Sequence, residues 1–405
     1  MSLSLIRTTR SLIAHRSQRR QDGYFAVVSL LGTQVIRSVR LLLVSVFFVG
    51  GFGFAHADDV QPIYTVPTEM CRGYFFVPVT LSPKEGYAED RTLWFIYDTG
   101  AGGSFVDPES IERVTGMRLK SGQSVSIKDA SAGPVSINKL PAKTTDLDHL
   151  SLALGREIDG ILAFNAFADF LLTLDYQNEQ IRLQKGKLPR PDNKTVFDAS
   201  GPDNRPWLVV RFSHRKRRML IDSGAGLSDL VVRKLEKFDT QLEPRVSGIS
   251  FRLKETRVRN SARASENAFI GGYELVTPTL QSTEGTELIG GKVLRNFILT
   301  FDQDRERVKL VQFEPETPIT FDSVKDHGLI LSPHKAGFVI TGTLDDTPAS
   351  RSEVQKGDVI THWNGEPVAR RSCESDPADV LSLVLGIDRG GQALTVELEL
   401  FNLVD

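Results

Sequence analysis

Two short segments of the sequence carry an aspartate in a setting suited to acid–base chemistry. Asp98 opens the run Asp-Thr-Gly-Ala-Gly, and Asp222 opens the run Asp-Ser-Gly-Ala-Gly. Each follows an apolar stretch typical of a strand, and we expect the glycines to permit a tight turn that presents the carboxylate. Two carboxylates about 3 Å apart share one proton, so one can activate water while the other protonates a carbonyl oxygen. The pair is therefore a candidate site for hydrolysis.

The elements that must position these aspartates occur twice in the chain. Residues 170–183 match residues 297–310 without a gap, and each copy predicts two strands joined by a polar turn. In both copies, this hairpin is preceded by a strand, a turn and a second strand that leads into the aspartate. We expect two mostly β lobes, residues 58–190 and 191–315, with Pro- and Gly-rich connections near their ends.

With both copies in view, the chain resembles the pepsin and retropepsin families of aspartic peptidases. The resemblance covers roughly residues 73–313 and includes the downstream apolar pairs at residues 161–163 and 288–290. It implies a mostly β fold of the two-lobed acid-protease β-barrel type, with Asp98 and Asp222 as the catalytic dyad. A peptide or protein is the implied substrate. Because both motifs lie in one chain, we expect a monomer.

The resemblance also assigns supporting roles to the residues that follow each aspartate. Gly100 and Gly224 are expected to form the turns. Thr99 and Ser223 are expected to exchange hydroxyl hydrogen bonds between the lobes, although ordinary turn chemistry explains such residues equally well.

Three features depart from the pepsin pattern. Ala101 and Ala225 follow the glycines, as in retropepsins, so fewer hydrogen bonds reach the dyad and a mildly acidic to neutral pH optimum is expected. Ala163 stands where the pattern has glycine. No tyrosine lies between Tyr97 and Tyr176, so the flap tyrosine of pepsins is missing, and residues 129–133 are the candidate for a smaller flap.

Residues 320–405 resemble a PDZ domain of the bacterial kind found beside peptidases. The likeness rests on residues 337–340, 346–349, 357–360 and 363–368. It implies a small β domain with one or two helices, including a helix over residues 376–385 and a closing strand over residues 394–400. PDZ domains add a peptide as an extra strand and hold its terminal carboxylate on backbone amides. The candidate carboxylate loop is Gly328, Leu329, Ile330 and Leu331, and a non-binding structural role is the alternative.

The first 57 residues are typical of a targeting sequence. Arginines at 37 and 40 precede an apolar run over residues 41–54, which ends in Ala-His-Ala at residues 55–57. This order predicts a signal peptide cleaved near Ala57 and export to a bacterial periplasm or the exterior. The run is too short for a comfortable membrane span, which disfavours the alternative of an anchor.

Charge and cysteine content exclude some functions and leave others open. The net charge is −2 for the whole chain and +6 for residues 1–57, which leaves −8 for the body and gives no support for nucleic-acid binding. The two cysteines, Cys71 and Cys373, fall in different predicted domains. An exported compartment permits a disulfide between them, but a single pair is no disulfide framework, so unpaired thiols are expected. The seven histidines lack metal-ligand spacing, and no cofactor motif occurs, so neither metal nor cofactor is predicted.

Two hypotheses remain at this point. The first is an exported aspartic endopeptidase whose PDZ-like domain selects or delivers a peptide. The second is a catalytically inactive peptide-binding scaffold, motivated by Ala163 and the missing flap tyrosine. A basic run at residues 214–218 is interpreted as a solvated hairpin tip in preference to a binding patch.

Overall fold

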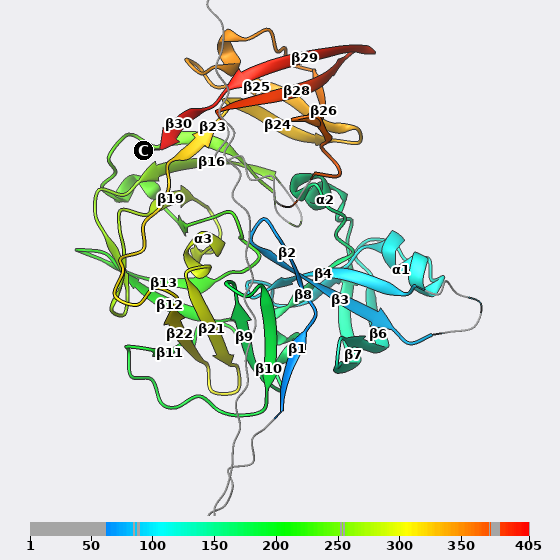
Figure 1. The fold of residues 1–405 in the computed structure, drawn as a ribbon, viewed down its shortest axis with the longest axis vertical. Coiled ribbons are helices and arrows are strands. Elements are labelled where there is room, and N and C mark those ends of the chain that lie inside the picture. The colour runs from blue at the N-terminus through cyan, green and yellow to red at the C-terminus, as the bar shows by residue number, and fades with distance from the viewer. Residues whose placement is uncertain are drawn as a thin grey trace, which may run out of the picture. The chain divides into compact units, whose positions relative to one another are not determined.

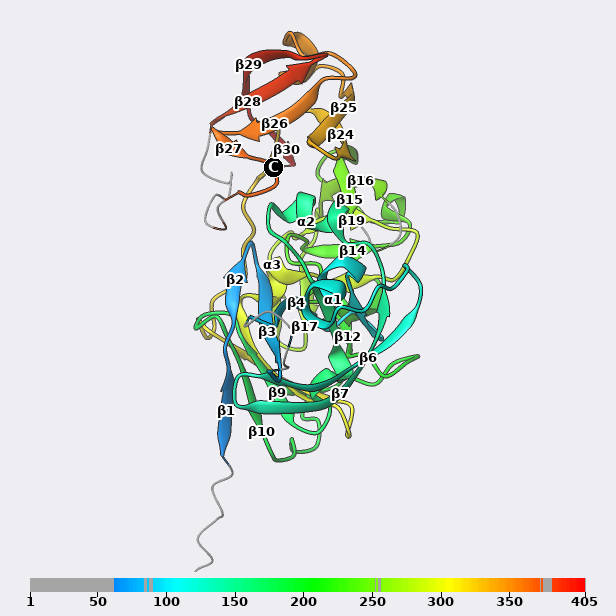
Figure 2. The same cartoon turned by 90° about the vertical axis from the view of Figure 1, so that its right-hand side faces the viewer.

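The computed structural model describes residues 62–404 except 84–85, 87–89, 252, 254–255, 372 and 374–380. The predicted signal peptide lies outside the described residues. Residues Asp58–Asp405 form one compact unit, which is mostly β as the sequence predicted (Figures 1 and 2). In the described part of the chain, no helix is both long and apolar enough to cross a bilayer.

A closed six-stranded barrel, here called the first barrel, carries Asp98. Its ring runs β3-β4-β8-β5-β7-β6 and closes through pairing of β3 with β6, and β2 extends it beside β3. The strands are β2 (Glu69–Cys71), β3 (Tyr74–Leu81), β4 (Thr92–Asp98), β5 (Ser104–Val106), β6 (Ser124–Ala132), β7 (Val135–Thr144) and β8 (Gly160–Ala163). Two short helices, α1 (Pro108–Thr115) and α2 (Asp148–Leu154), and the turn η1 (Phe164–Phe167) join them. Alternating apolar residues of β3 and β4 fill the interior.

A nine-stranded sheet, here called the second sheet, carries Asp222. Its strands are β12 (Trp207–Arg211), β13 (Lys216–Ile221), β14 (Leu230–Val232), β15 (Arg245–Phe251), β16 (Thr256–Arg263), β17 (Ala268–Ile270), β18 (Tyr273–Leu275), β19 (Thr279–Ser282) and β20 (Leu288–Ile289), with the turns η2 (Leu235–Lys237) and α3 (Gly291–Leu294). The pairing repeats that of the first barrel. Strand β13 lies parallel to β20 as β4 lies parallel to β8, and β14 lies parallel to β19 as β5 lies parallel to β7.

A six-stranded sheet, here called the shared sheet, joins the two halves. It contains β1 (Ile63–Val66), β9 (Leu171–Asp175), β10 (Gln180–Gln184), β11 (Val196–Asp198), β21 (Phe297–Asp302) and β22 (Arg307–Gln312). Strands β9–β10 and β21–β22 are the two repeated hairpins that the sequence predicted. The two copies pair directly, and the Thr173 and Thr300 hydroxyls hydrogen-bond at 3.0 Å (Figure 1). Equivalent residues therefore meet near a pseudo-twofold axis.

The C-terminal residues form a sheet of their own, here called the C-terminal sheet. Its strands are β24 (Leu329–His334), β25 (Gly337–Thr343), β26 (Val359–Trp363), β27 (Glu366–Pro367), β28 (Ser382–Arg389) and β29 (Gln392–Glu399), with the turn η3 (Ala349–Arg351). Strand β23 (Val324–Asp326) precedes this sheet in sequence, strand β30 (Phe401–Val404) follows it, and the two pair as a separate ribbon. The expected closing strand at residues 394–400 falls in β29.

The predicted helix over residues 376–385 is wrong where the structure describes it. Residues 382–385 belong to β28, which pairs with β29 along its whole length. The physical reason is the spacing of the buried side chains, because Leu383, Leu385 and Ile387 recur at every second residue, which is the period of a strand. Residues 376–380 lie outside the described residues.

The prediction of two unpaired thiols is also wrong. Cys71 and Cys373 form a disulfide, with their Cα atoms 4.7 Å apart although 302 residues separate them in sequence. The chain after β27 runs beside α2, where the Arg371 amide donates to the Gly155 carbonyl at 2.9 Å. This contact brings Cys373 to the end of β2. Sequence distance hid the pairing because tertiary packing alone creates the proximity.

Candidate functional site

Asp98 and Asp222 meet where the two pseudo-equivalent strands end. Asp98 is the last residue of β4, and Asp222 directly follows β13. Each aspartate starts the same turn, in which the alanine amide three residues on donates to the aspartate carbonyl at 3.2 Å. The two carboxyl groups lie within hydrogen-bonding reach of each other, and Gly100 N–H donates to Asp98 Oδ1 at 2.7 Å. The structure therefore brings the two sequence-predicted residues together.

The reason for Gly100 and Gly224 differs from the sequence interpretation. Neither residue has a positive φ, so the turn itself does not demand glycine. A Cβ on Gly100 would instead lie 2.5 Å from Asp222 Cγ, and one on Gly224 would lie 2.4 Å from Asp98 Cγ. Each glycine leaves room for the opposite carboxyl, so it is the close approach of the two turns that requires glycine.

Thr99 and Ser223 form a reciprocal network between the turns. The Thr99 amide donates to Ser223 Oγ and the Ser223 amide donates to Thr99 Oγ1, both at 3.0 Å. Each hydroxyl then donates across the interface, Thr99 to the Ile221 carbonyl at 2.7 Å and Ser223 to the Tyr97 carbonyl at 2.8 Å. Both residues are fully buried, so these four bonds fix the separation of the two turns.

The surroundings favour a shared proton. Burial raises the pKa of Asp98, and burial together with the nearby charge of Asp98 raises the pKa of Asp222 well above its usual range. Asp222 Oδ1 is buried and has no hydrogen-bond donor among the described residues. The positive charge of Arg205 lowers both pKa values slightly. Because two buried carboxylates in contact repel each other, the pair retains one proton and titrates as a unit.

A cleft of about 550 Å³ opens beside the two carboxyls. One part of its lining is apolar and comes from the first barrel and α2: Ile96, Phe105, Leu150, Leu154, Ile158 and Ile161. The second half of the molecule contributes polar residues, Arg259, Gln281, Ser282, Thr283 and Thr286, and also apolar ones, Leu220, Leu227, Val231, Leu253 and Leu288. The cleft therefore offers both apolar and polar contacts to a bound chain.

The candidate flap, residues 129–133, lies at the end of the β6–β7 hairpin. None of these residues lines the cleft, whereas α2 contributes Leu150, Ala153 and Leu154, and the β15–β16 hairpin contributes Leu253 and Arg259. Among the described residues, therefore, the predicted flap is not part of the cleft lining.

Two cleft residues escaped the sequence reasoning. Tyr74, the first residue of β3, lines the cleft, and burial followed by the charge of Asp222 raises the pKa of its phenol to about 12. Arg205 donates to the Gly100 carbonyl at 2.7 Å and pairs with Asp203 at 2.6 Å. Neither residue belongs to a recognisable sequence motif. Only the tertiary structure shows that each lies near an aspartate of the dyad.

Ala163 lies in the buried core of the first barrel, next to the dyad. It is fully buried opposite Asp98 in the β4–β8 register, and its amide donates to Ser104 Oγ at 3.1 Å. The equivalent Gly290 is constrained, since a Cβ there would lie 2.3 Å from the Ser228 carbonyl oxygen. The departure from the family pattern is therefore a local packing difference between the two copies.

The proposed carboxylate loop, Gly328 to Leu331, begins strand β24 at one edge of the C-terminal sheet. Gly328 N–H already donates to Asp326 Oδ1 at 2.6 Å, and Leu329 N–H donates to His327 Nδ1 at 2.9 Å. Leu329 is a core residue, and β24 contacts α2 and β15. Two of the four amides needed to hold a carboxylate thus have internal acceptors.

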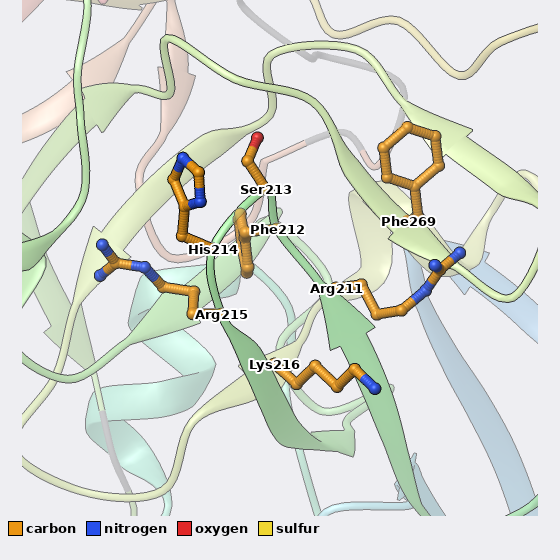
Figure 3. Close-up of a pocket in the computed structure, with 7 residues that line it drawn as sticks. All are labelled: Arg211, Phe212, Ser213, His214, Arg215, Lys216 and Phe269. Carbon is orange, nitrogen blue, oxygen red and sulfur yellow. The ribbon is translucent and has the colours of Figure 1, made fainter.

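The basic run at residues 214–218 lies at the turn between β12 and β13 (Figure 3). Phe212 N–H donates to the Arg215 carbonyl at 2.8 Å, which closes the turn. The open hollow beside it is lined by Arg211, Phe212, Ser213, His214, Arg215, Lys216 and Phe269. Arg215 lies over the Phe238 ring. These contacts match the interpretation of a hairpin tip.

One group of carboxylates in the described part of the chain is close enough to hold a metal ion. It comprises Asp107, Asp146 and Asp148, whose ligand atoms lie within 4.8 Å of one another. Asp107 already caps α1 by accepting from the Glu109 and Ser110 amides, and it also accepts from Leu147. Capping explains Asp107, and the other two carboxylates face solvent.

No protein-family model matches the sequence, and no curated protein sequence matches it either.

Proposed function

We propose that this protein is an aspartic endopeptidase of the pepsin or retropepsin type, built from two lobes in one chain. The observation that carries the proposal is the paired site itself. Asp98 and Asp222 lie together at the ends of pseudo-equivalent strands, held by the Thr99–Ser223 network beside a cleft of about 550 Å³. The two glycines leave room for this approach of two carboxyls.

Hydrolysis would proceed through a water molecule held between the carboxyls. The ionised carboxylate takes a proton from the water, whose oxygen attacks the peptide carbonyl carbon. The protonated carboxyl donates its proton to the carbonyl oxygen, which gives a neutral tetrahedral intermediate. Collapse of this intermediate breaks the C–N bond, with a proton passing to the leaving nitrogen. Because the two carboxyls share one proton and titrate as a unit, the roles of base and acid belong to the pair.

The C-terminal sheet resembles a PDZ domain in sequence, and we propose that its main role here is to brace the cleft. Its disulfide and Arg371 fasten it to β2 and α2, and α2 lines the cleft. Capture of peptide C-termini at Gly328–Leu331 is the weaker proposal, because two of those amides are occupied. Both roles fit an exported monomer acting on peptides in a bacterial periplasm or outside the cell.

The test is cleavage of an unstructured protein such as casein between about pH 3 and about pH 8. We expect Asp98→Asn and Asp222→Asn each to lower the rate more than about a thousandfold, since the carboxyls act as one unit. Asp345→Asn, at an exposed carboxylate that does not line the cleft, is the control for a general effect of losing a carboxylate. A folded wild type that cuts nothing, or variants that retain activity, would favour an inactive peptide-binding scaffold.

A further inference from the structure

The cleft holds two arginines whose surroundings differ. The Arg205 guanidinium is satisfied by the Asp203 carboxylate and the Gly100 carbonyl. Arg259, on β16, has no carboxylate within ion-pair distance among the described residues. Its guanidinium reaches only Ser247 oxygens there, Oγ at 3.4 Å and the carbonyl at 3.3 Å, which is the long limit of hydrogen bonding.

Because Arg259 is partly removed from water, the lack of an anionic partner costs free energy. The side chain lines the cleft and is partly buried, and desolvation lowers the pKa of its guanidinium. Asp229 and Asp326 attract it from beyond contact distance. A guanidinium removed from water favours an anionic partner strongly, so a carboxylate entering the cleft would gain more here than at the surface.

Arg259 lines the same cleft as Tyr74 and the two carboxyls. On the same wall, Gln281 is 4% exposed, and its amide oxygen has no donor among the described residues. This wall offers polar groups that the protein itself does not satisfy.

The opposite wall has a different chemistry. Phe105, Leu154 and Ile158 line it, and they belong to the apolar surface of the first barrel and α2. A peptide in the cleft would therefore meet apolar side chains from both halves of the molecule, together with the guanidinium on the second sheet. This combination selects for side-chain type along the substrate.

We propose that Arg259 binds a carboxylate of the substrate, so that the cleft selects acidic peptides with a large apolar side chain nearby. The inference rests on the proposed function of the cleft as a peptide-cleaving site. The planar guanidinium can hold a carboxylate through two parallel hydrogen bonds. That carboxylate belongs either to an Asp or Glu side chain or to the C-terminus of the peptide.

The experiment is a cleavage-site profile of a peptide library digested by the purified protein and read by mass spectrometry. We expect Asp or Glu to be enriched at one fixed distance from the cleaved bond, with an apolar residue near it. Arg259→Met should abolish the acidic preference, and Arg259→Glu should shift it toward Lys and Arg. Arg257→Met is the matched control, since Arg257 is on the same strand but pairs with Glu284 outside the cleft.

Single peptides then separate the two sources of the carboxylate. In the best substrate, Glu→Gln should lower kcat/KM about tenfold or more for the wild type and leave Arg259→Met unchanged. If amidation of the peptide C-terminus has this effect instead, the terminal carboxylate is the group bound. Arg259→Lys should keep part of the preference, and thermal melts of each variant show whether it is folded.

The outcomes keep the two proposals apart. Cleavage by the wild type without acidic preference, or an acidic preference that persists in folded Arg259→Met, overturns the role of Arg259 and leaves the peptidase proposal standing. If the wild type cuts nothing, the same library is used for capture on immobilised protein. Capture of acidic peptides that is lost in Arg259→Met would support Arg259 without catalysis, and capture unrelated to charge would overturn it.

Discussion

At the scale of single residues, the site is defined by how closely two turns approach each other. Thr99 and Ser223 exchange two hydrogen bonds in a fully buried interface, and their hydroxyls donate two more to the Ile221 and Tyr97 carbonyls. Each glycine makes room for the opposite carboxyl. Removing only one partner of such a hydrogen bond costs the most free energy of folding, because the other buried polar group is then left without a partner.

Ser223→Ala should show this cost. The change removes the acceptor of the Thr99 amide and the donor to the Tyr97 carbonyl. We expect a loss of about 1–3 kcal/mol in the free energy of unfolding, measured by denaturant titration. Ser213→Ala, at the exposed β12–β13 turn, should change it by less than about 0.5 kcal/mol. Equal effects for both variants would contradict a special role for the network.

The pH dependence of cleavage follows from the raised pKa values of the dyad. The active form holds one proton, so activity rises as the first proton leaves and falls as the second leaves. Burial and the charge of Asp98 raise the pKa of Asp222 above its usual value, which moves the falling limb to higher pH. We expect a bell-shaped profile of kcat/KM with its maximum above about pH 4. A maximum below about pH 3 would contradict this.

At the scale of elements, α2 connects the cleft with the C-terminal sheet. Leu150 and Leu154 of α2 line the cleft, while its last carbonyls, Leu152 and Ala153, accept from the Arg371 guanidinium at 3.2 and 2.6 Å. A cation at a helix C-terminus satisfies carbonyls that have no partner within the helix. The C-terminal sheet therefore holds one wall of the cleft in place.

Arg371→Met should loosen that wall. We expect about 1–3 kcal/mol of lost stability and a higher KM for peptide substrates, since the Ala153 carbonyl loses its donor and the Leu152 carbonyl keeps only the Gly155 amide. The adjacent Arg370 is exposed, so Arg370→Met serves as the control and should leave both quantities unchanged. If KM is the same in both variants, α2 does not depend on this contact for its position in the cleft.

At the scale of the whole molecule, the Cys71–Cys373 disulfide ties the two ends of the described chain together. It closes a loop over a sequence separation of 302 residues, and Cys71 lies three residues before Tyr74, which lines the cleft. Long loops gain the most from closure, because the crosslink removes many conformations from the unfolded chain. The disulfide therefore offsets part of the entropy that is lost when segments far apart in the sequence come into contact.

Removing the disulfide should lower stability measurably. We expect Cys71→Ser, Cys373→Ser and the double variant each to lose about 2–5 kcal/mol in the free energy of unfolding. A reducing agent should bring the wild type to the same denaturation midpoint and leave the double variant unaffected. Two reactive thiols in the unreduced, denatured wild type would show that the bond does not form in solution.

The sequence alone predicted the mostly β class, both repeated hairpins and the two aspartates that the structure places together. These features depend on local patterns, namely alternating apolar residues, polar turns and a motif that occurs twice. Only the tertiary structure decided the disulfide and the cleft positions of Tyr74, Arg205 and Arg259. These features depend on which distant segments pack together, and the distance between residues along the chain does not reveal that packing.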